Sequence, residues 1–189
     1  TGNDVFNVAS DNFDADDSFD GTSGADTVNI TGDTVIVNAD IDGATFANID
    51  AVTFANTTTD ITWTIANDEV DNDMSITASS TSGVVTIDGA QESSALTITT
   101  GAGADIITGG AGNDVINTGG ENDIITGGAG ADIITAGAGA NDIVYTTTTD
   151  GGTSFDLSAN LDTDITESTS STAGIGDYII GFASASDQI

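Results

Sequence analysis

The sequence predicts an all-β chain wound as an elongated parallel β-solenoid. A nine-residue repeat occurs five times between Thr100 and Tyr145, and short alternating runs of apolar and polar residues occupy the first hundred residues. Helical periodicity is weak throughout, so strands are favoured. A separate N-terminal β-sandwich packed against the repeats is the alternative. We expect an irregular β-rich region over 1–99, a regular roll over 100–145 and a β-rich capping or assembly segment over 146–189.

The strands of the first region are predicted from alternation. Apolar residues stand at every second position or nearly so, with Thr, Asn or Asp between them, which is the pattern of a half-buried strand. Trp63 lies in such a run, and we expect it in the core rather than on a sugar-binding platform. The runs are Thr27 to Ile30, Thr34 to Val37, Ala51 to Ala55, Ile61 to Ile65, Met74 to Thr77, Val84 to Ile87 and Leu96 to Thr99.

Each copy of the repeat has a glycine-rich half and a half of the form D-x-U-x, in which U is a large aliphatic residue. Glycine permits a sharp turn, and the β-branched half favours a short strand. Units of nine predict a coil of about two repeats. The copies are TGAGADIIT (Thr100 to Thr108), GGAGNDVIN (Gly109 to Asn117), TGGENDIIT (Thr118 to Thr126), GGAGADIIT (Gly127 to Thr135) and a stretched AGAGANDIVY (Ala136 to Tyr145). The aliphatic residues expected to point inward are Ile107, Ile116, Ile125, Ile134 and Val144.

The same nine-residue repeat predicts that the chain binds a metal ion. Glycine turns leave backbone carbonyls without strand partners, and an aspartate ends each turn; hard oxygen donors of this kind suit calcium. Because a coil takes two repeats, each turn lies over the next turn but one. We therefore expect Asp105, Asp123 and Asp142 on one edge of the roll, Asp114 and Asp132 on the other, and several calcium ions between stacked turns. Glu121 and Asn141 depart from the template, so weaker ion sites are expected beside them.

The repeats resemble the repeats-in-toxin (RTX) family of secreted bacterial proteins. The resemblance implies calcium-dependent folding outside the cell and export by type I secretion. It also implies carbonyl ligands from the first and third repeat positions, which are Thr100, Ala102, Gly109, Ala111, Thr118, Gly120, Gly127, Ala129, Ala136 and Ala138. The predicted site set further contains Gly103, Gly112, Gly130 and, from the isolated copy GTSGADTVN at Gly21 to Asn29, Asp26. The tail from Gly176 to Ile189 resembles the segment that often closes such arrays.

Composition limits the chemistry of the chain. It has 31 acidic residues and no Lys, Arg or His, so its formal charge is −31. About five calcium ions would remove roughly a third of that charge. Without a cation to offer a phosphate, the chain is not expected to bind nucleic acid, and no apolar run is long enough for membrane insertion. Cysteine is absent too, so thiolate and imidazole chemistry are excluded. We expect no enzyme activity, although a carboxylate pair for glycoside hydrolysis stays open.

Two classes of function fit these features. The first is a secreted structural protein of the bacterial cell exterior: a surface layer, sheath, filament or adhesin stalk that self-associates into a homopolymer or lattice. RTX-containing surface-layer proteins are the nearest resemblance. The alternatives are an ice-binding or other ligand-binding solenoid, suggested by Thr62-Trp63-Thr64 and Thr97-Ile98-Thr99, and the noncatalytic tail of a secreted enzyme.

Overall fold

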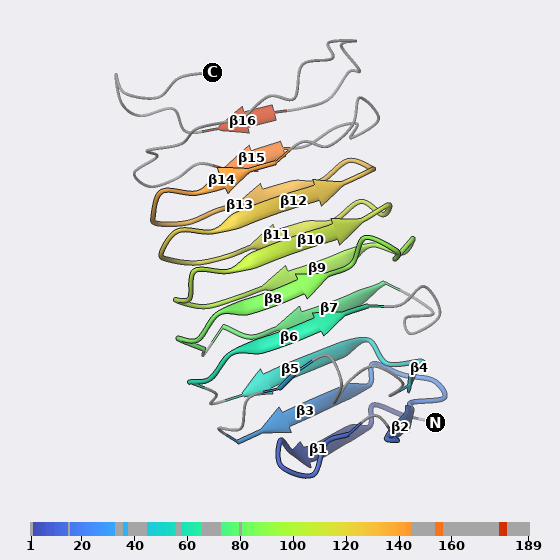
Figure 1. The fold of residues 1–189 in the computed structure, drawn as a ribbon. Coiled ribbons are helices and arrows are strands. Elements are labelled where there is room, and N and C mark those ends of the chain that lie inside the picture. The colour runs from blue at the N-terminus through green and yellow to red at the C-terminus, as the bar shows by residue number, and fades with distance from the viewer. Residues whose placement is uncertain are drawn as a thin grey trace.

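The computed structural model describes residues 2–14, 16–32, 36–37, 45–55, 58–65, 73–79 and 81–144, together with the strands at 154–156 and 178–180. In these residues the chain forms two parallel sheets and a short strand pair, and no helix. Figure 1 shows the strands stacked from β1 at one end to β16 at the other. The all-β solenoid predicted from the sequence is confirmed.

We call the larger sheet, with nine strands, the long sheet, and the one with five strands the short sheet. In spatial order the long sheet contains β1 (Val5–Ala9), β3 (Thr27–Thr31), β5 (Ala51–Ala55), β7 (Met74–Thr77), β9 (Leu96–Thr99), β11 (Val115–Asn117), β13 (Ile133–Thr135), β15 (Ser154–Asp156) and β16 (Tyr178–Ile180). The short sheet contains β6 (Ile61–Thr64), β8 (Val85–Asp88), β10 (Ile106–Gly110), β12 (Ile124–Gly128) and β14 (Asp142–Ile143). A further pair joins β2 (Ser18–Asp20) to β4 (Thr45–Ala47).

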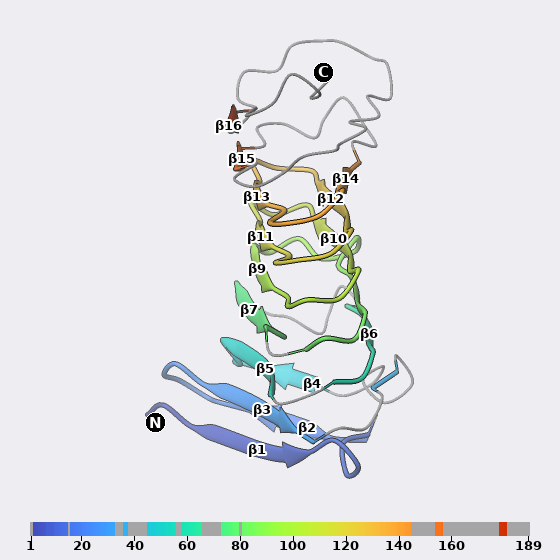
Figure 2. The same cartoon turned by 90° about the vertical axis from the view of Figure 1, so that its left-hand side faces the viewer.

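The strand register shows how the coil length changes along the chain. Val5 pairs with Thr27 and Thr27 with Ala51, so each early coil is longer than two nonapeptides. In the roll, Val115 pairs with Ile133, and the other sheet advances by the same amount. Two nonapeptides therefore make one coil of the roll, as predicted. Figure 2 shows β9, β11 and β13 facing β10, β12 and β14 across a narrow interior.

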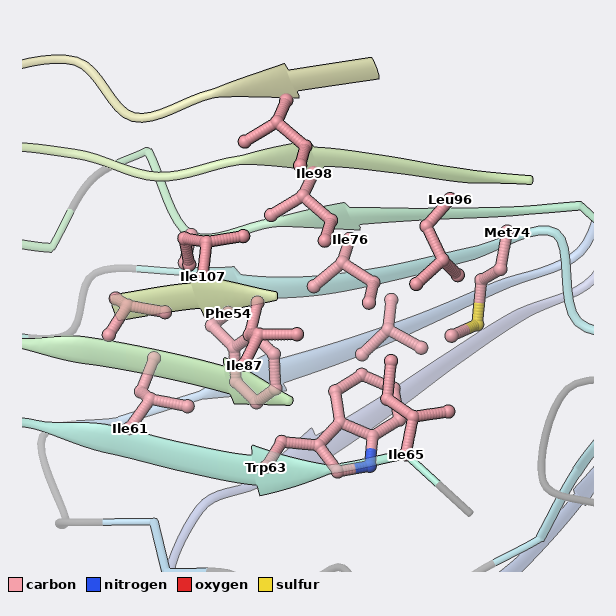
Figure 3. Close-up of a cluster of buried hydrophobic side chains, with 14 of the residues drawn as sticks. Phe54, Ile61, Trp63, Ile65, Met74, Ile76, Ile87, Leu96, Ile98 and Ile107 are labelled. Carbon is pink, nitrogen blue, oxygen red and sulfur yellow. The ribbon is translucent and has the colours of Figure 1, made fainter. Parts of the chain in front are cut away.

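A single core runs along the solenoid. Alternate strand residues are buried because successive side chains point to opposite faces of a strand, as in β5, where Val52 and Phe54 are buried and their neighbours are half-exposed. Trp63 is fully buried and its ring centroid lies 5.4 Å from that of Phe46. Figure 3 shows Trp63 among aliphatic side chains from both sheets. The prediction that Trp63 is a core residue is confirmed. The continuous long sheet also rules against a separate N-terminal sandwich.

In the roll the core narrows to a ladder of isoleucines. Ile107, Ile116, Ile125 and Ile134 are buried as predicted, but the prediction for Val144 is wrong: Ile143 is the buried residue of β14, and Val144 is half-exposed. The other strands predicted over the first hundred residues are found, with ends shifted by about one residue. Of the strand predicted over Thr34 to Val37, Ile36 makes a bridge to Ile61, and Thr34 and Val35 lie outside the described residues. Apart from β15 and β16, the predicted cap over 146–189 also lies outside them.

Candidate metal centre

Aspartates gather in two rows along the edges of the solenoid. We call the turns that lead into the long sheet the long-sheet row; in the roll they end at Asp114 and Asp132. We call those that lead into the short sheet the short-sheet row; they end at Asp105, Asp123 and Asn141. All five of these side chains are buried, with at most 1% of their surface exposed. The predicted separation of the aspartates into two edges is thus seen for 105 and 123 against 114 and 132.

Each buried aspartate is fixed by a backbone amide of the coil before it. The strands place one turn over the next, so a carboxylate at the end of a turn meets the amide at the same register position. The Oδ1 atoms of Asp105, Asp114, Asp123 and Asp132 accept hydrogen bonds from the amides of Val85 (2.9 Å), Leu96 (2.7 Å), Asp105 (2.8 Å) and Asp114 (2.9 Å). One oxygen of each carboxylate is therefore committed to the fold.

The second oxygen is the unusual feature. Oδ2 of Asp105, Asp114 and Asp123 is buried and has no hydrogen-bond partner among the described residues. Burial raises the pKa of the Asp114 carboxyl to about 6, although the amides of Leu96 and Gly110 oppose the shift. Burial likewise raises the pKa of Asp123 to about 6 and that of Asp105 above its usual range. A buried carboxylate without a cation costs several kcal/mol, and this chain has no cationic side chain to supply.

The glycine that opens each turn of the long-sheet row brings other oxygens close to that carboxylate. A Cβ at Gly109 would collide with the carbonyl oxygen of Gly127 in the next coil and with Oδ2 of Asp114. A Cβ at Gly127 would collide with Oδ2 of Asp132. A carbonyl from one coil and a carboxylate from the other thus converge on a site that only glycine leaves open. This donor set fits calcium, which takes six to eight oxygen ligands.

The short-sheet row is built differently, because its turns open with Thr or Ala. The hydroxyls of Thr100 and Thr118 are buried and donate to the carbonyls of Thr118 and Ala136, each at 3.0 Å. They also lie beside Asp105 and Asp123 and lower the pKa of those carboxyls against the larger effect of burial. The two hydroxyls therefore link successive coils of the short-sheet row.

The last copy of the repeat is not stretched, which corrects its alignment. Ile124 pairs with Asp142 and Ile125 with Ile143, so Asn141 stands where the other copies have aspartate. Its Oδ1 accepts the amide of Asp123 at 2.9 Å, as the aspartates do one coil lower. Asp142 lies on the strand and is half-exposed. A neutral amide therefore occupies the position predicted for a carboxylate, and the row predicted as Asp105, Asp123 and Asp142 contains Asn141 in its third place.

The same geometry recurs far from the repeats, at Asp26. This side chain is fully buried, its Oδ1 accepts the amide of Asp4 at 2.7 Å, and its Oδ2 has no partner among the described residues. A Cβ at Gly21 would collide with that Oδ2 and with the carbonyl oxygen of Asn48. Gly21 precedes Asp26 by five residues, the spacing of Gly109 and Asp114. The isolated repeat at Gly21 to Asn29 therefore forms a turn like those of the long-sheet row.

The predicted carbonyl donors lie in these turns or in the strand ends beside them. The second-position carbonyls of Gly101, Gly110 and Gly119 accept amides of the next coil at 2.8–3.0 Å, from Gly120, Ala129 and Ala138. These second-position carbonyls therefore bond to the next coil, and the first-position carbonyls of Thr118 and Ala136 also accept hydrogen bonds, from threonine hydroxyls. No group of three or more acidic side chains converges within the described residues. A calcium site here would need backbone oxygens beside its carboxylates.

One buried acid was absent from the sequence-based set. Glu92 is 1% exposed, and its Oε2 has no hydrogen-bond partner among the described residues. It precedes the first nonapeptide copy, in a turn that does not follow the template, so the repeat pattern alone could not indicate it.

The part of the chain that the structure describes contains no helix able to span a membrane.

Comparison with known proteins agrees with this geometry. The family model described as RTX calcium-binding nonapeptide repeat (4 copies) matches residues 97–125 and 118–146. No curated protein and no solved structure matches the chain. The matched part coincides with the two-nonapeptide coils and their buried aspartates. This chain therefore carries RTX calcium-binding nonapeptide repeats, folded as a β-roll that continues the solenoid begun at β1.

Proposed function

We propose that this chain is a secreted, noncatalytic structural module of the bacterial cell exterior, stiffened by calcium. The observation that carries the proposal is the stacking of buried carboxylates in a chain without a single cationic side chain. Charges so placed resist folding unless a cation joins them. Calcium outside the cell would supply this cation, so the chain would fold after export.

In this proposal the ions lie between consecutive turns of each row. In the long-sheet row the donors are Asp114, Asp132 and the carbonyls around Gly109 and Gly127; in the short-sheet row they are Asp105, Asp123 and the neighbouring first- and third-position carbonyls. The turn at Asp26 is a further site. Bound calcium neutralises charge and joins successive coils; because it binds only the folded state, it stabilises the fold by mass action.

A structural role is supported by the shape. The described strands stack along one axis, and β1 and β16 stand at the ends of the long sheet. Strand edges of this kind can pair with another chain. We propose self-association into a filament or lattice, with export through type I secretion as is typical of RTX proteins.

The proposal is tested by titrating the metal-free chain with calcium while following far-UV circular dichroism and sedimentation. We expect a coil-to-β transition in the micromolar to millimolar range, followed by larger particles visible by electron microscopy. Particles that fold with calcium yet stay monomeric would refute the assembly role and keep the calcium role. Magnesium at equal concentration is the control, since it tolerates such irregular oxygen sites poorly.

One observation favours ice binding as a second candidate. Thr53, Thr77 and Thr99 pair in register on the outer face of the long sheet, and Asn117 follows them in the next coil. The large ring of Trp63 does not disturb the outer face, because it is buried. A clear thermal-hysteresis gap at micromolar protein would support this function, and its absence would exclude it.

A further inference from the structure

The turn that precedes the nonapeptides is two residues longer than those within the roll. Thr97 pairs with Val115, so this step from one coil to the next takes the length of two nonapeptides. Asp88 pairs with Thr108, and this step takes two residues more. The extra residues therefore lie between β8 and β9, in the turn Gly89–Ala95. This turn belongs to the long-sheet row and lies directly below the turn Gly109–Asp114.

In the longer turn, a leucine replaces the aspartate. Leu96 stands at the register position of Asp114 and gives its amide to the Asp114 carboxylate. A Cβ at Gly89 would meet the carbonyl oxygen of Gly109 and, at 2.8 Å, Cδ1 of Leu96. At Gly109, one coil higher, the corresponding neighbours are a carbonyl oxygen and Oδ2 of Asp114. A methyl group thus occupies the place of the expected carboxylate oxygen.

Glu92 brings a carboxylate into the same turn. Its Oε1 accepts the amides of Ser93 (2.7 Å) and Ser94 (2.8 Å), which folds the side chain back into the turn. The other oxygen, Oε2, is buried without a partner among the described residues. Exposure of 1% is unusual for a glutamate that forms no ion pair.

Glu92 is also close to the turn above it. Its carbonyl accepts the amide of Ala111 at 2.8 Å, and a Cβ at Gly110 would lie 2.6 Å from that carbonyl oxygen. After burial and the charge of Asp132, the charge of Glu92 is the smallest of the causes that raise the pKa of Asp114. Two buried carboxylates with unpartnered oxygens therefore belong to adjacent stacked turns.

We propose that Glu92 and Asp114 supply the carboxylates of a further calcium site, between the turns Gly89–Ala95 and Gly109–Asp114. Glu92 replaces the aspartate that Leu96 displaces, and the ion closes the lower end of the long-sheet row, where coils of the roll meet the longer coils of the N-terminal region. The site rests on the proposed calcium-dependent function of the roll. It extends that function to a residue outside the nonapeptide template.

The test is the number of calcium ions held by Glu92→Gln, counted by native mass spectrometry and by isothermal titration on the full chain. Glutamine keeps Oε1 as the acceptor for Ser93 and Ser94, so the turn should persist; circular dichroism at saturating calcium verifies the fold. The control is Asp11→Asn, which removes one charge from an exposed residue in the turn after β1, outside the nonapeptide roll. We expect the wild type and the control to hold equal numbers of ions and Glu92→Gln to hold one fewer.

Each other outcome has a distinct meaning. If all three proteins bind the same number of ions with the same affinities, Glu92 is a structural turn residue and the inference is wrong, while the function of the roll stands. If the wild type binds no calcium, the proposed function fails as well. If Glu92→Gln does not fold, Glu92→Asp decides: it keeps the charge but shortens the reach, and an unchanged ion count with unchanged affinity would overturn the proposal.

Discussion

Asp114→Asn should change the stability of the protein in opposite directions with and without calcium. The substitution removes a buried charge but keeps an oxygen that can accept the amide of Leu96. Asn141 shows that the site tolerates an amide, since it occupies the equivalent position in the other row, accepts the Asp123 amide and donates to the Ala136 carbonyl at 3.2 Å. The variant is therefore expected to fold.

The magnitude follows from the pKa of Asp114. Its rise from 3.8 to about 6 means that ionisation at neutral pH disfavours the metal-free fold. At 1.36 kcal/mol per pKa unit, removing the charge should stabilise the metal-free form by about 3 kcal/mol. With calcium, the variant lacks a ligand, and each tenfold loss of affinity removes about 1.4 kcal/mol at saturating metal. A loss greater than roughly 160-fold therefore outweighs the gain of about 3 kcal/mol, and we expect such a loss, which makes the variant less stable than the wild type in calcium.

The assay is denaturant unfolding followed by circular dichroism, in a chelator with a stabilising osmolyte and again in millimolar calcium. Asp88→Asn is the control: Asp88 is exposed and its Oδ1 accepts the Ala90 amide, which asparagine can replace. It should change stability by no more than about 0.5 kcal/mol in either buffer. A destabilised Asp114→Asn in chelator, with an unchanged calcium response, would show that the carboxylate serves only the fold.

Further predictions concern pH, glycine and aspartate. Because the pKa of Asp114 and Asp123 is raised in the fold, the metal-free folded protein binds more protons than its unfolded chain. Lowering the pH from about 7.5 to about 4.5 should therefore stabilise it by about 2 kcal/mol per carboxylate, measured by denaturant unfolding in chelator with the same osmolyte; falling stability would contradict this. Gly109→Ala should weaken calcium binding at least tenfold by isothermal titration, whereas Gly120→Ala, whose Cβ would have its nearest contact at 4.0 Å, should not; equal losses would argue against a site at Gly109. Asp123→Ala should cost several kcal/mol of calcium-loaded stability more than Asp88→Ala in thermal unfolding; parity would remove Asp123 from the ligands.

Periodicity predicted most of the roll because geometry leaves few choices. Once glycine turns and β-branched strands alternate in units of nine, a parallel stack with two units in each coil follows, and the buried isoleucines fix the register. The aspartates then lie in two rows. The strands of the first hundred residues could also be predicted, because a strand with one buried face alternates apolar and polar residues.

The errors arose where two readings were chemically equivalent along the chain. In the last copy, Ile143 and Val144 are both aliphatic, and Asn141 precedes Asp142, so alignment on the aspartate implied an extra residue. Register with Ile124 and Ile125 resolves the choice. The sequence did not indicate Glu92 for another reason. Its proposed role depends on a turn that is two residues longer than the corresponding turns of the roll, and this length is known only when the strands on either side are paired.

The most direct test is the far-UV circular dichroism spectrum of the full chain after exhaustive removal of divalent ions at low ionic strength. We predict that the β-sheet signal of the roll is lost and returns cooperatively when calcium is restored, because the buried aspartates have no cation of their own. A spectrum unchanged by the removal would contradict the idea that calcium holds this polyanion in its coils.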